Sequence, residues 1–289
     1  MDNYRIISAP NSGRFAQRLE RLHQEVTTFL AVERQQGRQL QYTKVFLSDA
    51  ANQEPELMRS ALMTDELRAA AFTIIQQPPV GGAKIALLLK TSDTPTDFCL
   101  HAMRLTDAEA AHQSSYVQTV MLFDKYLEAT RQMGIELKTH CVRTWLYVRD
   151  IDANYSGVVR ARNDVFRQHG LTPDTHFIAS TGIGGRTGER NVLVAMDFLT
   201  YPGIKEDQKT YLKALDHLNP THEYGVAFER ATRLTLSSGQ QRFLVSGTAS
   251  IDHRGEVLFV GDVRRQTLRL LENIEALLAN GGATMHDVK

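Results

Sequence analysis

Apolar residues recur at helical spacing near the start of the chain and then give way to short apolar runs. Within residues 13–37 one face of a predicted helix carries Phe15, Leu19, Leu22, Val26, Phe29 and Leu30. The segments Tyr42–Asp49, Ala70–Gln77 and Ala83–Thr91 are rich in β-branched, aromatic or aliphatic residues, which predicts strands. A short helix is predicted between the first two strands, over residues 55–63.

The same order of elements returns further along the chain. Helices are predicted over residues 115–133 and 157–169, and strands over 143–150, 175–181 and 191–201. Helix, strand, helix, strand, strand therefore occurs twice. Self-similarity of this kind predicts a repeated structural module.

A third and incomplete copy is predicted near the end of the chain. Residues 242–251 and 256–261 resemble two strands joined by a tight turn, and residues 262–280 an amphipathic helix. The helical segment QTLRLLENIEA (Gln266–Ala276) repeats QTVMLFDKYLEA (Gln118–Ala129). The strands that should follow this helix have no counterpart in the remaining residues.

These patterns divide the chain into four parts. Residues 1–92 are predicted to form a degenerate module, 93–203 a second module, 204–223 a polar linker, and 224–289 a third, truncated module. A half-module would leave a strand edge and an apolar helix stripe uncovered. We therefore expect a longer native chain, or completion of the sheet by a partner subunit or by unmatched elements of the first module.

Composition excludes several classes of function. Lys and Arg total 33, as do Asp and Glu, so no global field attracts nucleic acid or an anionic membrane surface. No apolar run approaches the ~20 residues that span a bilayer, and the N-terminal segment lacks the apolar stretch of a secretory signal. Two cysteines, Cys99 and Cys141, cannot form a disulfide framework, so a cytoplasmic location is expected. The histidines show no metal-ligand spacing, and neither metal nor cofactor is expected.

The third copy carries a set of small and polar residues in a recognisable order. They are Ser246-Gly247 at a strand end, Gly261-Asp262 at a helix start, Gln266 and Asn273 within the helix, and Gly281-Gly282 and Asp287-Val288 after it. This order resembles the opening half of the Rid (YjgF) family, also called endoribonuclease L-PSP-like proteins. The segment FERATRL (Phe228–Leu234), followed by VSGTASI, resembles chorismatases, which carry a Rid-like domain.

The resemblance implies a fold and an assembly. It implies an α+β fold of the chorismate mutase-like type, in which each module has a mixed β-sheet with two helices packed on one face. Rid proteins are trimers with ligand clefts between subunits. Three such modules in one chain would give a pseudo-trimer, and a homo-oligomer is the other expected assembly.

The resemblance also implies a chemistry that the sequence only partly supports. Rid deaminases hydrolyse an enamine or imine with an arginine that holds the substrate carboxylate and a glutamate that positions water. In the second copy these positions fall near Thr175 or His176 and near Ala195, and in the first copy near Ala70 and Ile85. Both copies lack the pair, so the catalytic residues remain unassigned.

Two groups of residues are candidates for substrate binding. The resemblance implies that Ser246, Gly247 and Thr248 line a ligand cleft; the alternative is a close-packed strand bend that requires glycine.

The second group is aromatic and basic. Arg230 follows Phe228 by two residues, and with nearby Tyr224 it would anchor a carboxylate substrate. Arg162 matches a cleft-facing position of the family. The alternative for both arginines is an ordinary exposed side chain.

Two hypotheses from different classes remain open. In the first, the protein binds a small carboxylate metabolite in clefts between modules and hydrolyses an enamine, an imine or a chorismate-like enol ether. In the second, it is a non-catalytic member whose modules only bind ligand or assemble, which the missing arginine–glutamate pair favours.

Overall fold

The first module is a four-stranded mixed sheet covered on one face by helices. A computed structural model describes residues 1–289. The sheet order is β1-β4-β2-β3, with β2 and β3 parallel and β4 antiparallel to both of its neighbours. Its elements are β1 (Asp2–Ser8), α1 (Phe15–Gln35), β2 (Gln39–Leu47), α2 (Ala50–Arg59), α3 (Asp65–Ala69), β3 (Ala71–Gln76), η1 (Val80–Gly82) and β4 (Ile85–Ser92).

The second module repeats this topology. Its sheet order is β5-β8-β6-β7, again with one parallel pair and two antiparallel pairs. The predicted repeat is thus confirmed for these two sheets. Each module also begins with a strand, β1 or β5. The sequence pattern did not predict β1, and it indicated a hairpin over residues 98–105 where the structure has the single strand β5, which pairs with β8. The elements are β5 (Cys99–Met103), α4 (Asp107–Ala110), α5 (Ser115–Arg131), α6 (Leu137–His140), β6 (Cys141–Val148), α7 (Ile151–Gln168), β7 (Ala179–Gly184) and β8 (Val194–Thr200).

The third sheet differs from the prediction in two ways. It has the order β11-β10-β9, and β9 (Lys209–Leu212) lies inside the segment 204–223 that was expected to be a linker. The predicted hairpin of 242–251 with 256–261 is wrong, because β11 (Gln241–Val245) pairs with the preceding strand β10 (Ala231–Thr235).

The exposure of residues 256–261 explains why the predicted hairpin does not form. Val257 is 61% exposed and Val260 is 82% exposed, and none of residues 256–261 is fully buried, so this segment does not join a hydrophobic core. Only the isolated bridge Ile251–Val257 remains of the predicted pairing. Helix α8 (Val263–Asn280) follows as predicted. The chain also contains the short 3-10 helices η2 (Glu206–Gln208), η3 (Thr221–Tyr224) and η4 (Met285–Asp287).

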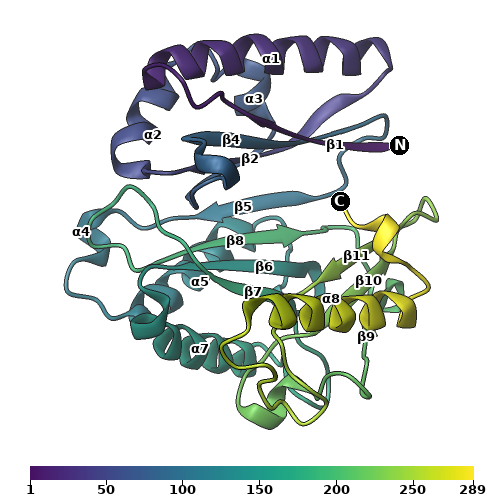
Figure 1. Cartoon of the computed structure of the whole chain (residues 1–289). Helices are drawn as coiled ribbons and strands as arrows, with labels where there is room; N and C mark the ends of the chain where they lie inside the picture. The colour runs from purple at the N-terminus through teal and green to yellow at the C-terminus, as the bar shows by residue number, and fades with distance from the viewer.

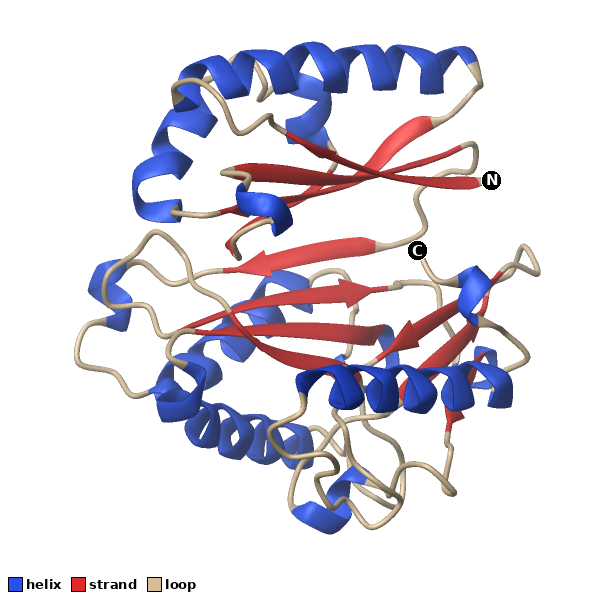
Figure 2. Cartoon of the chain, in the orientation of Figure 1, coloured by secondary structure: helices blue, strands red, loops and turns tan.

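The two four-stranded sheets face each other, with their helices on the outside (Figure 1). α1 lies over the first sheet, α5 and α7 cover the second, and α8 runs beside the third sheet at one side of this sandwich. Figure 2 shows the strands gathered inside and the helices outside. Between the facing sheets Ile75, Tyr147 and Ala195 form a small buried cluster. None of the helices has the length and apolar character needed to cross a bilayer.

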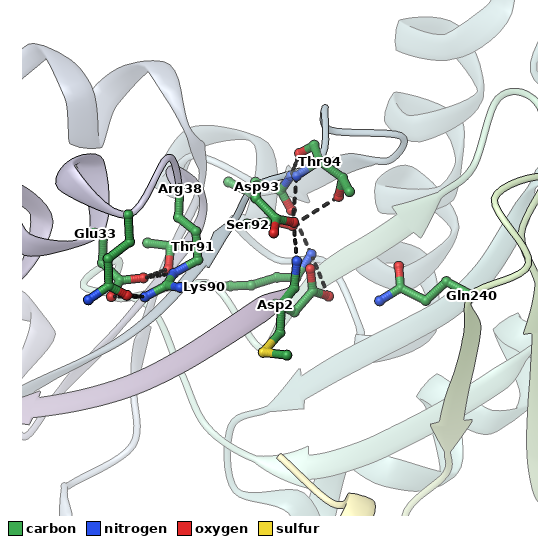
Figure 3. A network of polar contacts seen from close by, with 12 residues as sticks. Asp2, Glu33, Arg38, Lys90, Thr91, Ser92, Asp93, Thr94 and Gln240 are labelled. Carbon is green, nitrogen blue, oxygen red and sulfur yellow. Dashed lines mark hydrogen bonds and ion pairs between the residues drawn. The ribbon is translucent and has the colours of Figure 1, made fainter.

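A polar network ties the first module to the third. Asp2 on β1 accepts a hydrogen bond from Arg242 on β11 at 2.8 Å and lies 3.2 Å from the Lys90 ammonium. Figure 3 shows Asp2 and Lys90 beside a second pair, Glu33 and Arg38. The hydrogen bond from Arg38, helped by Thr91, lowers the pKa of Glu33 to about 2. The start of the chain is therefore fixed against the third sheet by charged groups.

Close packing of α5 against α7 yields a stability prediction. A Cβ atom at Gly157 on α7 would lie 2.3 Å from Ser115 Oγ and 3.0 Å from the Tyr116 backbone nitrogen. We expect Gly157→Ala to lower the free energy of unfolding by about 1–3 kcal/mol, as overpacking does. Urea denaturation measures this, with Gly203→Ala as the control, because nothing lies within 4 Å of a Cβ there. Equal stabilities of the two variants would contradict the packing.

Candidate functional site

Four of the predicted site residues come together where the second module meets the third. The Phe228 ring, just before β10, lies 5.5 Å from the Arg162 guanidinium of α7 and 5.5 Å from that of Arg230. Arg230 also lies 5.4 Å from the ring of Tyr224, at the end of η3. These distances are typical of cation–π contacts.

Both arginines are buried, so their alternative interpretation as exposed side chains is wrong. Arg162 is 1% exposed and Arg230 is 6% exposed, and neither forms an ion pair. Burial lowers the pKa of each guanidinium. Arg230 donates two hydrogen bonds to the carbonyl of Asn219, at 3.2 and 2.9 Å. The Nε and Nη2 atoms of Arg162 have no hydrogen-bond partner.

The residues Ser246 and Gly247 join the third module to the edge of the second. Ser246 Oγ accepts a hydrogen bond from the Ser180 backbone at 2.8 Å, and the Gly247 N–H donates to Thr181 Oγ1 at 2.9 Å. A Cβ at position 247 would lie 2.9 Å from Thr181 Cγ2. A side chain at this position would press on the Thr181 methyl group, so the close approach favours glycine. Thr248 lies beside them, with its hydroxyl donating to the Ser246 carbonyl at 3.3 Å.

Arg143 on β6 belongs to this junction and was missed from the sequence. It is 5% exposed, forms no ion pair, and its Nη1 lies 3.5 Å from Ser246 Oγ. Burial lowers the pKa of its guanidinium to about 9. The available signal was a charged residue inside the otherwise apolar strand CVRTWLYV.

A cavity of about 140 Å³ opens beside Phe228 and Arg230. It lies between the loop 172–177 of the second module and the segment 211–230, and it has room for more than one water molecule. Thr175 and His176, the positions that the family resemblance assigns to the deaminase arginine, are among its lining residues. Of the predicted site residues only Phe228 and Arg230 line this cavity; Tyr224, Arg162, Ser246, Gly247 and Thr248 do not, and they lie at the module junction around it.

Glu229 gives this cavity an acidic group. One of its carboxylate oxygens accepts the Phe177 N–H at 2.9 Å, and the side chain forms no ion pair. Burial raises the pKa of the Glu229 carboxyl, partly offset by the Phe177 hydrogen bond and by the charges of Lys213 and His222. Lys213, which also lines the cavity, is exposed and has no acidic partner. The sequence did not identify Glu229, although it lies within the segment FERATRL.

His176 forms another wall of the cavity. Its Nδ1 lies 2.9 Å from the Phe177 carbonyl, and its ring stacks on Tyr211 at 4.7 Å. Nε2 has no hydrogen-bond partner, although Glu206 lies 3.6 Å away. Burial lowers the pKa of His176, so at neutral pH the ring is uncharged and Nε2 is available as an acceptor.

The position that the resemblance assigns to the deaminase glutamate lies elsewhere. Ala195 on β8 is 1% exposed and belongs to the cluster between the two facing sheets. No group of three or more His, Cys, Asp or Glu side chains is arranged to hold a metal ion.

Comparisons with known proteins agree with the architecture. The chain is an α+β protein with two mixed four-stranded sheets, and its fold resembles that of a chorismatase. Superposition on the crystal structure of a chorismatase gives a TM-score of 0.62 at 18% identity, covering 96% of this chain and 77% of that chain. No family model matches the sequence, and no curated protein sequence matches it.

Proposed function

We propose that the chain binds a small carboxylate metabolite in the cavity between its second and third modules. The observation that carries this proposal is the pairing, in one cavity, of cationic Lys213 and Arg230 with the unpaired carboxyl of Glu229. A ligand with a carboxylate and a nearby cationic or hydrogen-bond-donating group would pair with the two cations and with the Glu229 carboxyl at once. A 2-imino acid, which carries an iminium beside its carboxylate, has this chemistry.

Glu229 is suited to act as general base and acid in the hydrolysis of such an imine. Water adds to the iminium carbon while Glu229 takes a proton from the water, and the protonated Glu229 then gives that proton to the nitrogen of the carbinolamine. The carbon–nitrogen bond breaks as the carbonyl forms, and the departing ammonia takes the hydroxyl proton and leaves as ammonium. The products are a 2-oxo acid and ammonium, so the reaction needs no redox partner. A carboxyl whose pKa is raised is a more effective general acid and base near neutral pH.

Hydrolysis of chorismate is a second candidate, favoured by the likeness of fold to a chorismatase over nearly the whole chain. Chorismate also carries carboxylates. It is larger than a three-carbon imino acid, and the cavity of about 140 Å³ favours the smaller substrate.

Replacing Glu229 with glutamine tests the proposal. With a system that generates 2-aminoacrylate, we expect wild-type protein to speed ammonia release. We expect Glu229→Gln to lower kcat by about 10²–10⁴-fold. Pyruvate binding should persist in the variant, because the glutamine side chain has the size of the glutamate that it replaces and carries no charge that repels a carboxylate. Calorimetry measures that binding.

The matched control is Glu223→Gln, which changes an exposed glutamate in η3. It should leave both measurements unchanged. Full turnover by Glu229→Gln would refute the catalytic role. Release of pyruvate from chorismate, with no effect on 2-aminoacrylate, would support the second candidate, and pyruvate binding without any turnover would support the non-catalytic hypothesis.

A further inference from the structure

Lys44 is a buried lysine in the layer between the two facing sheets, away from the cavity. It lies in the middle of β2, is 7% exposed, and its Nζ donates a hydrogen bond to Tyr147 Oη on β6. The rings of Phe46, Trp145 and Tyr147 surround it, with centroids 5.4, 5.5 and 4.7 Å from Nζ. A lysine in such surroundings has lost most of its hydration.

No carboxylate pairs directly with this amine. Asp197 is linked to the amine through Tyr147, whose hydroxyl donates to Asp197 Oδ2 at 3.0 Å. Asp197 already pairs with Arg104 at 2.9 Å and accepts from Thr73 at 3.0 Å. The negative charge is therefore shared with another cation, and the amine lacks a counter-ion of its own.

Burial consequently favours the uncharged amine. It lowers the pKa of Lys44 to about 8, an effect that Asp197 opposes and that Arg104 and Arg143 reinforce. A neutral lysine amine is the nucleophile that condenses with carbonyl compounds.

A buried cation beside Lys44 supplies an anchor for an anion. The Arg143 guanidinium lies 5.0 Å from the centroid of the Trp145 ring, which Lys44 also contacts, and it has no acidic partner. Phe46 and Trp145, whose rings contact Lys44, are only half-buried, and Gly247, which shares the Thr181 hydroxyl with Arg143, is exposed, so residues next to both cations are in contact with solvent. The Trp145 ring thus contacts both the Lys44 amine and the Arg143 guanidinium.

We propose that Lys44 forms an imine with a small 2-oxo acid whose carboxylate is held by Arg143. The amine nitrogen attacks the carbonyl carbon, and Tyr147 relays a proton from the nitrogen to the carbonyl oxygen. The protonated carbonyl oxygen is now the hydroxyl of a carbinolamine. This hydroxyl leaves with the remaining N–H proton as water, and the carbon–nitrogen double bond forms. The step releases one water molecule and involves no oxidation, and it does not depend on the cavity at Glu229.

Reductive trapping tests this inference. The full chain is incubated with pyruvate and cyanoborohydride, and the adduct is located by peptide mass mapping. We expect one preferred adduct at Lys44, with a trapping rate that rises through about pH 8 as the amine loses its proton. Acetone, which lacks a carboxylate, should label Lys44 at least tenfold more slowly than pyruvate does.

Three variants and a control test the roles of the individual residues. Lys44→Met should lose the adduct, Tyr147→Phe should slow trapping about tenfold or more, and Arg143→Met should abolish the preference for pyruvate over acetone. Lys84→Met, at an exposed lysine, should behave as wild type.

Labelling spread evenly over surface lysines of the wild type, or an unmodified Lys44 peptide, would overturn the inference. That measurement on the wild type decides the question even if a variant does not fold.

Discussion

Replacing Asp197 with alanine is expected to lower the free energy of unfolding by about 3–5 kcal/mol, the cost of breaking a buried ion pair by removing one partner. Asp197 is 0% exposed and accepts hydrogen bonds from Arg104, Thr73 and Tyr147. Thr73 belongs to the first module and Asp197 to the second. The substitution therefore leaves Arg104 without its counter-charge and removes a bond between modules.

Urea denaturation at neutral pH measures this loss. Asp124→Ala, at an exposed position of α5, is the control and should change stability by no more than about 0.5 kcal/mol. A loss below about 1 kcal/mol for Asp197→Ala would show that this network does not hold the two modules together.

Arg162→Met is expected to stabilise the protein, by about 1–4 kcal/mol, because burial of a charge without an acidic partner costs more than burial of an apolar chain of similar length. Arg162 is 1% exposed, two of its nitrogens have no hydrogen-bond partner, and Ser180 Oγ lies 3.5 Å from the third. Methionine preserves the contact with Phe228. Denaturation again measures the effect.

Arg160→Met on the same helix is the matched control, because Arg160 is exposed. Its stability should stay within about 0.5 kcal/mol of wild type. Pyruvate binding should be unchanged in Arg162→Met, since Arg162 does not line the cavity. Destabilisation by Arg162→Met would mean that the guanidinium is compensated in a way that these contacts do not reveal.

The repeated module could be predicted because its signals are local. The spacing of apolar residues in α1, α5 and α8 and the apolar runs of β4 and β6 identify these elements without knowledge of the fold. The fold class followed from the repeat and from the family resemblance.

The elements that were missed carry weak local signals. β1 has only one fully buried residue, and Ile6 within it is 67% exposed. β9 is four residues long and lies in a polar segment. β11 overlaps the predicted strand 242–251, but its partner was predicted wrongly: it pairs with the preceding strand β10, across a short turn closed by the hydrogen bond from the Leu236 N–H to the Gln240 carbonyl, at 2.9 Å. Strand partners of this kind are decided by packing, which a single sequence does not display.

Some residues of the candidate site could likewise be predicted from the sequence, and others could not. The aromatic and basic residues Tyr224, Phe228, Arg230 and Arg162 were identified by their types and by resemblance, and the structure brings them together. Glu229 and Lys44 were missed because their chemistry comes from burial. Lys44 and Tyr147 are separated by 103 residues in the chain, so no local pattern could join them.

A crystal structure of the full chain with saturating pyruvate would show whether the cavity beside Arg230 is a carboxylate-binding site. Pyruvate carries the carboxylate and the carbonyl of the proposed hydrolysis product. The account predicts pyruvate in the cavity, with its carboxylate toward Lys213 and Arg230 and its carbonyl beside Glu229. An empty cavity, whether or not pyruvate is bound at Lys44, would contradict the proposed function.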